Sequence, residues 1–303
     1  MKSTLFAAVL ALLLSACASV APPPPTPAPA PGMTPAPPGV TVRAPRIDRS
    51  YTSLNQDSRS LFIVLHYTVL DWEKSLKVLT TGGQVSSHYL VRDNPAISYA
   101  LVDENRRSWH AGASFWAGHQ NLNSSSIGIE IVNPGYTDSP AGRVYAPFPQ
   151  AQIDEVIALV RDIQQRHNVK PERIIGHADI APGRKQDPGP NFPWKQLHEA
   201  GLIPWPDASW VLLKRLEHEV APRDIGWLQE RLIRIGYNVP RSGQLDTLTK
   251  ETIATFQMKY RPGDIAGTPD AETAALIEVA ATPGGMRMAV AREPETRPYT
   301  SRF

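Results

Sequence analysis

The chain has 303 residues, of which 42% are hydrophobic and 20% are charged, a composition that is typical of globular domains and excludes wholesale disorder. Its formal net charge of +2, from 31 basic and 29 acidic residues, excludes nucleic-acid binding driven by bulk charge. The length is sufficient for two modest domains with extensions.

The N-terminus has the features of a secretory signal peptide. Residues 1–16 combine a positive start at Lys2 with an apolar core over residues 5–14, which is too short to span a bilayer as a stable helix. Leu14-Ser15-Ala16-Cys17 resembles the lipobox of bacterial lipoproteins, which implies cleavage before Cys17 and lipid attachment to it. The alternative is a plain secreted protein in which Cys17 is incidental.

Cys17 is the only cysteine, so no intramolecular disulfide can form. Several acyl chains on this residue make a firm membrane anchor. No Asp follows Cys17, and by analogy with bacterial lipoproteins this predicts a periplasmic protein anchored to the outer membrane of a Gram-negative bacterium. Residues 17–45 then form a linker, since ten of the 30 prolines lie within residues 21–38, where no core can be packed.

Residues 46–206 alternate strand and helix patterns and form the first predicted domain. The run Leu61–Leu65 is apolar on both faces, as in a buried strand, and His66 follows it. In residues 126–132 the isoleucines alternate with other residues, which places Glu130 on the face opposite to them. The remaining predicted elements are helices over residues 71–81 and 151–167 and strands over residues 85–91, 97–102 and 173–175. This interleaving predicts an α/β fold with a mixed central sheet flanked by helices.

A polar loop, residues 176–190, follows the last of these strands. It brings together an imidazole (His177), an ammonium (Lys185) and a carboxylate (Asp187), and its glycines and prolines favour a non-repeating backbone. Loops that leave scaffold strands commonly carry function. Imidazole and carboxylate ligands suit zinc, and a catalytic zinc has three protein ligands and one open position.

Five stretches in this order resemble the zinc N-acetylmuramoyl-L-alanine amidases of the amidase-2 group, which are related to phage T7 lysozyme and peptidoglycan recognition proteins. They are His66, Ser87-His88-Tyr89, Trp109-His110-Ala111-Gly112, Ser126-Ile127-Gly128-Ile129-Glu130, and the loop from Gly176-His177 to Gly189. The resemblance covers residues 46–206, and with the lipobox it points to the outer-membrane lipoproteins of this group.

The resemblance implies one zinc ion held by His66, His177 and Asp187. It implies that Glu130 transfers the proton of the attacking water and that Lys185 stabilises the oxyanion. For His88, Trp109, His110 and Asn133 we expect contacts with the substrate or the walls of its cleft.

Residues 207–284 predict a small three-helix domain. Its helices are expected over residues 224–236, capped by Asp224, over residues 249–260, and from residue 268 to about residue 280. Trp227–Leu232, Gly243–Asp246 and Phe256-Gln257 resemble the peptidoglycan-binding type 1 domain. The alternative is a packing domain that binds nothing. Residues 285–303 are expected to be an unfolded tail.

Together these features predict a monomeric zinc amidase that cleaves the bond between N-acetylmuramic acid and L-alanine in peptidoglycan or muropeptides, during remodelling or recycling of the cell wall. Two alternatives remain open. One is a recognition lipoprotein without turnover, which would be favoured by loss of a zinc ligand. The other is a different zinc muropeptide hydrolase, which the reaction products would distinguish.

Overall fold

The computed structural model describes residues 44–140 and 142–289. The predicted signal peptide, Cys17 and most of the linker lie outside these residues. Residues 44–54, which contain no helix or strand, belong to a first unit of the chain, and a second compact unit begins at Asn55. In the described ranges, no helix is both long and apolar enough to cross a membrane.

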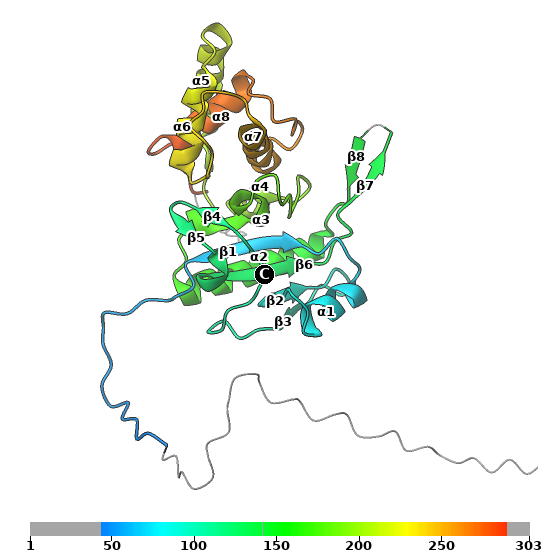
Figure 1. Ribbon diagram of the computed structural model, residues 1–303, viewed down its shortest axis with the longest axis vertical. Coiled ribbons are helices and arrows are strands. Elements are labelled where there is room, and N and C mark those ends of the chain that lie inside the picture. Colours follow the sequence, from blue (N-terminus) through cyan, green and yellow to red (C-terminus); the bar gives the residue numbers. More distant parts are fainter. Residues whose placement is uncertain (1–43, 141, 290–303) are drawn as a thin grey trace, which may run out of the picture. The chain divides into compact units, whose positions relative to one another are not determined.

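A five-stranded mixed sheet forms the centre of the second unit, in the order β3-β2-β6-β1-β9 (Figure 1). Strand β6 pairs in parallel with β1 and β2, β9 pairs in parallel with β1, and β3 is the antiparallel edge. The mixed sheet expected from the sequence is therefore confirmed. Its strands are β1 (Phe62–Tyr67), β2 (Tyr89–Val91), β3 (Ser98–Ala100), β6 (Ser126–Ile131) and β9 (Ile174–Gly176).

Helices α2 (Gln150–His167) and α4 (Trp194–Glu199) cover one face of the sheet. The alternation along β1 and β6 explains this packing, because successive side chains of a strand point to opposite faces. Ile63 and Leu65 of β1 and the three isoleucines of β6 bury themselves against the apolar stripe of α2. Ile153, Val156, Val160 and Ile163 make up that stripe.

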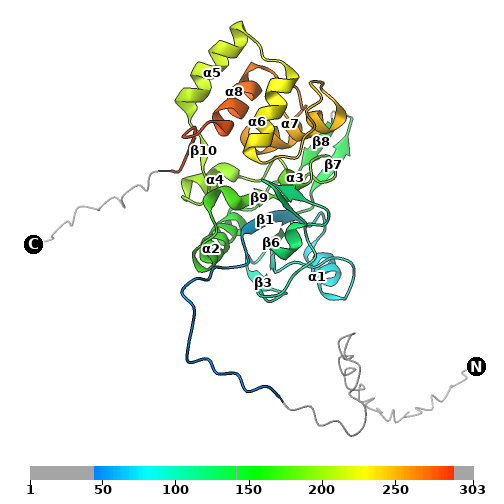
Figure 2. The same cartoon turned by 60° about the vertical axis from the view of Figure 1, so that its left-hand side comes forward.

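The opposite face belongs to one hydrophobic cluster with the C-terminal helices, and the short helix α3 (His177–Ile180) contacts both β1 and the C-terminal region, as Figures 1 and 2 show. Phe62 and Val64 of β1 and Ile175 of β9 share one hydrophobic cluster with Leu232, Phe256 and other residues of these helices. The boundary predicted near residue 206 therefore does not divide the core, since apolar side chains from both sides of it pack together. The helices are α5 (Ala208–Val220), α6 (Ile225–Ile235), α7 (Thr247–Tyr260) and α8 (Ala271–Ala281).

Aspartates begin most of the longer helices. Asp71 caps α1 (Trp72–Thr80), Asp224 caps α6 and Asp270 caps α8, each by accepting a backbone N–H of the first turn. Asp207 and Asp246 do the same for α5 and α7. The three helices expected in the C-terminal region are present, and α5 is an additional one.

Short elements complete the fold. They are β4 (Phe115–Trp116), β5 (His119–Gln120), β7 (Tyr136–Ser139), β8 (Gly142–Tyr145), α3 (His177–Ile180), β10 (Trp205–Pro206), β11 (Met286–Arg287), and the 3-10 turns Leu122–Ser124 and Pro171–Arg173.

Two expectations from the sequence were wrong. The loop after β9 begins with the short helix α3, so its backbone is not irregular throughout. The tail expected from residue 285 contains β11, which pairs in antiparallel fashion with β10. These backbone hydrogen bonds fix the beginning of the tail, and a local sequence pattern does not report a partner 80 residues away.

Candidate active site

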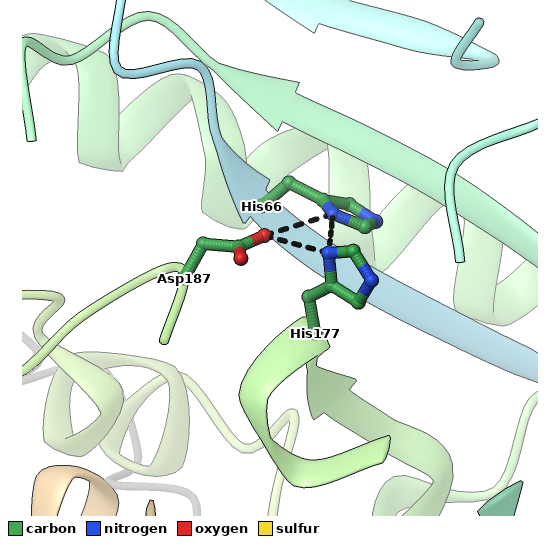
Figure 3. Close-up of side chains that lie close together, drawn as sticks. All are labelled: His66, His177 and Asp187. Atoms are coloured by element: carbon green, nitrogen blue, oxygen red, sulfur yellow. Dashed lines mark hydrogen bonds and ion pairs between the residues drawn. The ribbon is translucent and has the colours of Figure 1, made fainter. Parts of the chain in front are cut away.

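Three side chains from two strand ends and a loop meet on the sheet face opposite α2. His66 ends the apolar run of β1, His177 is the first residue of α3, and Asp187 lies in the loop that follows (Figure 3). His66 Nδ1 lies 2.9 Å from His177 Nδ1 and 3.0 Å from Asp187 Oδ2, and His177 Nδ1 lies 2.9 Å from the same oxygen. All three residues are buried, and together they could hold a metal ion.

The backbone brings His177 and Asp187 together. The Ala178 amide donates to the Asp187 carbonyl at 2.9 Å, which closes the loop between them. Gly176 is required at the start of α3, since a Cβ there would lie 2.9 Å from Pro188 Cδ. The glycine and proline that the sequence places around this loop thus allow the close approach of its two ends.

The hydrogen bond behind His177 determines which of its ring nitrogens carries the hydrogen. His177 Nε2 lies 3.1 Å from the Ala111 carbonyl oxygen, which can only accept. The neutral ring therefore carries its hydrogen on Nε2 and has a lone pair on Nδ1. Arg184 donates to the same carbonyl at 2.9 Å and to that of Ala113, so its guanidinium serves the structure of this segment.

A longer relay determines the tautomer of His66. Ser126 Oγ donates to the Leu122 carbonyl at 2.6 Å, and it therefore accepts from His110 Nε2 at 3.1 Å. The Nδ1 atom of His110 then has a lone pair, which accepts from His66 Nε2 at 2.9 Å. His66 consequently also has its lone pair on Nδ1.

This donor set fits a zinc ion. Two imidazole lone pairs and a carboxylate oxygen converge with no hydrogen among them, an arrangement that a cation stabilises. Burial, together with the nearby His177, lowers the pKa of His66 from 6.5 to about 4, so its ring is neutral near pH 7. Neutral imidazole is the form that binds metal.

Glu130 lies beside these ligands in the register of the sheet. Strands β1 and β6 pair His66 with Glu130, and Glu130 Oε1 lies 4.0 Å from His66 Nδ1. Burial, and then the charge of Asp187, raises the pKa of Glu130 well above its ordinary value. Glu130 Oε2 is buried and has no hydrogen-bond partner in the part of the chain that the structure describes.

One cavity of about 220 Å³ contains the three candidate ligands together with Glu130, Lys185 and His110. Lys185 is exposed, and its side chain has no hydrogen bond or ion pair within residues 44–140 and 142–289. The opposite wall is apolar and follows the residues around α1, which include Val69, Leu70, Val78, Leu79 and Val85. Val69 has a φ of 55°, a left-handed conformation that is costly for a β-branched residue and is found mainly at functional sites.

Two of the residues expected to contact substrate do not reach this cavity. His88 is buried, its Nδ1 accepts from Ser108 and from the Gly128 amide, and its Nε2 donates to the Arg106 carbonyl. Asn133 is buried as well, and its amide binds the Pro147 carbonyl and the Gly135 amide. Both residues bind backbone groups, and a contact of either with substrate stays a prediction.

His110 and Trp109, which were also expected to contact substrate, differ in their position relative to the cavity. His110 lines the cavity, but both its ring nitrogens are used in the relay to His66. Its ring packs against Gly128, where a Cβ would lie 2.5 Å from His110 Cγ. Trp109 is half exposed, with the guanidinium of Arg107 3.9 Å from its ring centre, and does not line the cavity.

Comparisons with known proteins agree with this geometry. Residues 56–190 match the family model "N-acetylmuramoyl-L-alanine amidase", and residues 222–277 match the model "Putative peptidoglycan binding domain". The chain is 45% identical to N-acetylmuramoyl-L-alanine amidase AmiD of Escherichia coli over 226 residues, which are 71% of this chain and 80% of that protein.

Two solved structures are similar over most of the described fold. One is E. coli AmiD in complex with anhydro-N-acetylmuramic acid-L-Ala-D-gamma-Glu-L-Lys, with a TM-score of 0.69 and 41% identity, covering 77% of this chain and 92% of that one. The other is AmpDh3 of Pseudomonas aeruginosa in complex with an anhydromuramic pentapeptide, with a TM-score of 0.70 and 39% identity, covering 77% and 96%. On this identity and coverage, together with its His66, His177 and Asp187 cluster, the chain belongs to the N-acetylmuramoyl-L-alanine amidase family.

Proposed function

We propose that this amidase works with one zinc ion held by His66, His177 and Asp187 and cleaves the bond between the lactyl group of N-acetylmuramic acid and L-alanine. The convergence of three acceptor atoms beside Glu130 and Lys185 in one cavity carries this proposal. All three ligand types are present, which argues against a recognition protein without turnover. The muropeptides in the two related complexes support the substrate class.

Zinc, when bound, supplies a Lewis acid that lowers the pKa of a water molecule to near neutrality. The chain holds the ion through neutral imidazoles, whose tautomers the Ala111 carbonyl and His110 determine. Those outer hydrogen bonds also fix the ring planes, which raises metal affinity.

Glu130 is the general base and acid of the proposed reaction. It lies next to His66 in the register, within reach of a water molecule at the ligand cluster. Its carboxylate takes the proton of the attacking water and delivers it to the nitrogen of the leaving L-alanine. The buried Oε2 has no competing partner among the described residues, so the carboxylate is available for this transfer.

Lys185 stabilises the negative charge that develops on the carbonyl oxygen. Lys185 lines the cavity, and its ammonium has no carboxylate partner in the described ranges. A cation without a competing carboxylate is free to approach the oxyanion. Arg184 cannot take this role, because its guanidinium binds the carbonyls of Ala111 and Ala113.

The regions outside the catalytic domain attach the protein to the cell wall and to the membrane in this proposal. We assign catalysis to residues 46–206 and binding of the wall to residues 207–284, which would raise the local substrate concentration. We assign residues 1–16 to a signal peptide, lipid modification to Cys17, and a spacer role to the linker up to residue 45. The protein then acts in the periplasm from the outer membrane, as a monomer.

The test uses the zinc-loaded protein with purified sacculi and with a muramoyl tripeptide, and identifies the products by mass spectrometry. We expect free peptides that begin with L-alanine. A chelated sample and the Glu130→Ala variant, which should retain the ion, serve as controls without turnover. Intact substrate together with retention of the protein on sacculi contradicts the proposal and favours a wall-binding protein. Cleavage at another bond favours a different muropeptide hydrolase.

A further inference from the structure

A buried carboxylate connects the metal-binding loop to the C-terminal helices. Asp179 lies on α3, two residues after His177, and only 3% of its surface is exposed. Its Oδ2 accepts from the Gly176 amide at 2.9 Å. Its other bonds come from the C-terminal region, because Tyr237 donates its hydroxyl to Oδ1 at 2.7 Å and Lys259 Nζ lies 3.3 Å from Oδ2.

The two partners are themselves held from the amidase side. Tyr237 is 2% exposed, and the ring of Trp116 lies edge-on to it with 4.9 Å between the ring centres. Lys259 is 8% exposed, and its ammonium lies 4.1 Å from the ring centre of Trp194. Neither side chain is available for a wall polymer, because both are enclosed by the protein.

The helix that carries His177 cannot hold its own position. Helix α3 has four residues, too few for a helix that is stable by itself. A carboxylate buried without partners is strongly unfavourable, so Asp179 stays inside only while its three donors are in place. The position of His177 therefore depends on residues that come 60 to 82 positions later in the chain (237 − 177 and 259 − 177).

We propose that Tyr237 and Lys259 are positioning residues of the metal site, which act through Asp179 on His177. The C-terminal region then has a second role besides the one proposed for it at the wall, since it sets the affinity of the amidase for its ion. The inference rests on the proposed zinc site but not on the identity of the substrate.

The experiment compares Tyr237→Phe and Lys259→Met with two matched controls in the full chain, kept in mild detergent. Tyr260→Phe removes the hydroxyl of a neighbouring tyrosine of the same core cluster, and Lys195→Met removes an exposed ammonium on α4. The readouts are the zinc dissociation constant from competition with a chelator, the melting temperature of the metal-free protein, kcat and KM on the muramoyl tripeptide, and retention on sacculi.

We expect the two test variants to bind zinc about 10- to 100-fold more weakly, as for other residues that orient a metal ligand, while the controls keep the affinity of the parent. At subsaturating zinc their kcat should fall, with KM and retention on sacculi unchanged. Lys259→Arg should restore part of the affinity. Folded test variants with the parent's zinc affinity overturn the proposal, even if they melt at a lower temperature. A parent that binds zinc but leaves the amide intact refutes the proposed function alone.

Discussion

At the scale of single residues, the hydrogen bonds behind His66 and His177 decide what these side chains can bind. Each ring uses Nε2 as a donor, to His110 and to the Ala111 carbonyl, and each points the lone pair of Nδ1 at the Asp187 carboxylate. The sequence indicates which residues are ligands. It does not indicate which nitrogen binds, because that depends on the Ala111 carbonyl for His177 and on the relay that ends at Ser126 and Leu122 for His66.

The relay predicts a measurable role for Ser126. Ser126→Ala removes the acceptor of His110 Nε2, so the His110 ring is free to change its tautomer and no longer fixes that of His66. We expect zinc affinity to fall about tenfold, with a small change in the free energy of unfolding. Chelator competition and thermal unfolding measure the two quantities.

Ser108→Ala is the matched control, since Ser108 is also buried and also bonds a histidine, His88, that lies outside the relay. Zinc affinity should stay close to that of the parent in this variant. Equal losses in the two serine variants would show that the effect comes from general loosening of the core and not from the relay.

At the scale of elements, local patterns predicted the parts that place the candidate ligands. The isoleucines of residues 126–132 identified the buried face of β6 and hence the side on which Glu130 lies. The helix predicted over residues 71–81 and the predicted cap Asp224 agree with the beginnings of α1 and α6. Helix α5, which Asp207 caps, is not among the predicted helices, because it begins at the boundary placed between residues 206 and 207.

Other features could not be predicted, because they depend on partners far apart in the sequence. The bonds of Asp179 to Tyr237 and Lys259 join residues 58 and 80 positions apart. Pairing of β10 with β11 joins Trp205 to Arg287. Residue types near each of these positions look ordinary, and only the packing of the helices against the sheet brings them together.

An ion-pair network at the end of α2 predicts that the stability of the fold depends on pH. Glu104 binds Arg166 and His167 of this helix and accepts from the Tyr89 hydroxyl of β2. Hydrogen bonds from Arg166, and then those from His167 and Tyr89, lower the pKa of Glu104 from 4.5 to about 2 against the effect of burial. A carboxyl group whose pKa is lower in the folded state than in the unfolded state stabilises the fold at pH values above the unfolded-state pKa. This stabilisation is lost as the pH falls from the unfolded-state pKa to the folded-state pKa.

Glu104→Gln should therefore reduce the free energy of unfolding at pH 7 by about 1–2 kcal/mol. The difference between parent and variant should shrink as the pH falls from 4.5 toward 2. Urea titrations at several pH values measure it, and the exposed Glu219→Gln on α5 is the control. A difference that stays constant over this range contradicts the linkage.

At the scale of the whole molecule, the second face of the sheet and the C-terminal helices share one hydrophobic cluster, and α3 contacts both β1 and α7. Phe62, Val64 and Ile175 are each at most 1% exposed, and they belong to one cluster with Leu228, Leu232 and Phe256. Loss of the C-terminal members of the cluster would expose a large apolar patch, which favours aggregation. The catalytic and C-terminal regions are thus parts of one folded unit.

Truncation tests this view. A chain that ends at residue 206 loses the members of this cluster that the C-terminal helices supply, among them Leu228, Leu232 and Phe256, and we expect it to be insoluble or to bind the dye ANS, with little ordered tertiary structure. The full-length protein should unfold in a single calorimetric transition, since one core is shared. A soluble, well-folded fragment with native zinc affinity, or two separate transitions in the full chain, would show instead that the regions are independent.

The late position of β11 and of the Asp179 partners has a consequence for biosynthesis. Contacts between residues far apart in sequence form slowly, because a long stretch of chain must be ordered before they gain any stability. His66, His177 and Asp187 leave the ribosome before Tyr237, Lys259 and the strand at Met286–Arg287. An incomplete chain would therefore lack the partners of Asp179, and under the positioning role proposed above the metal ion would bind only to the completed polypeptide.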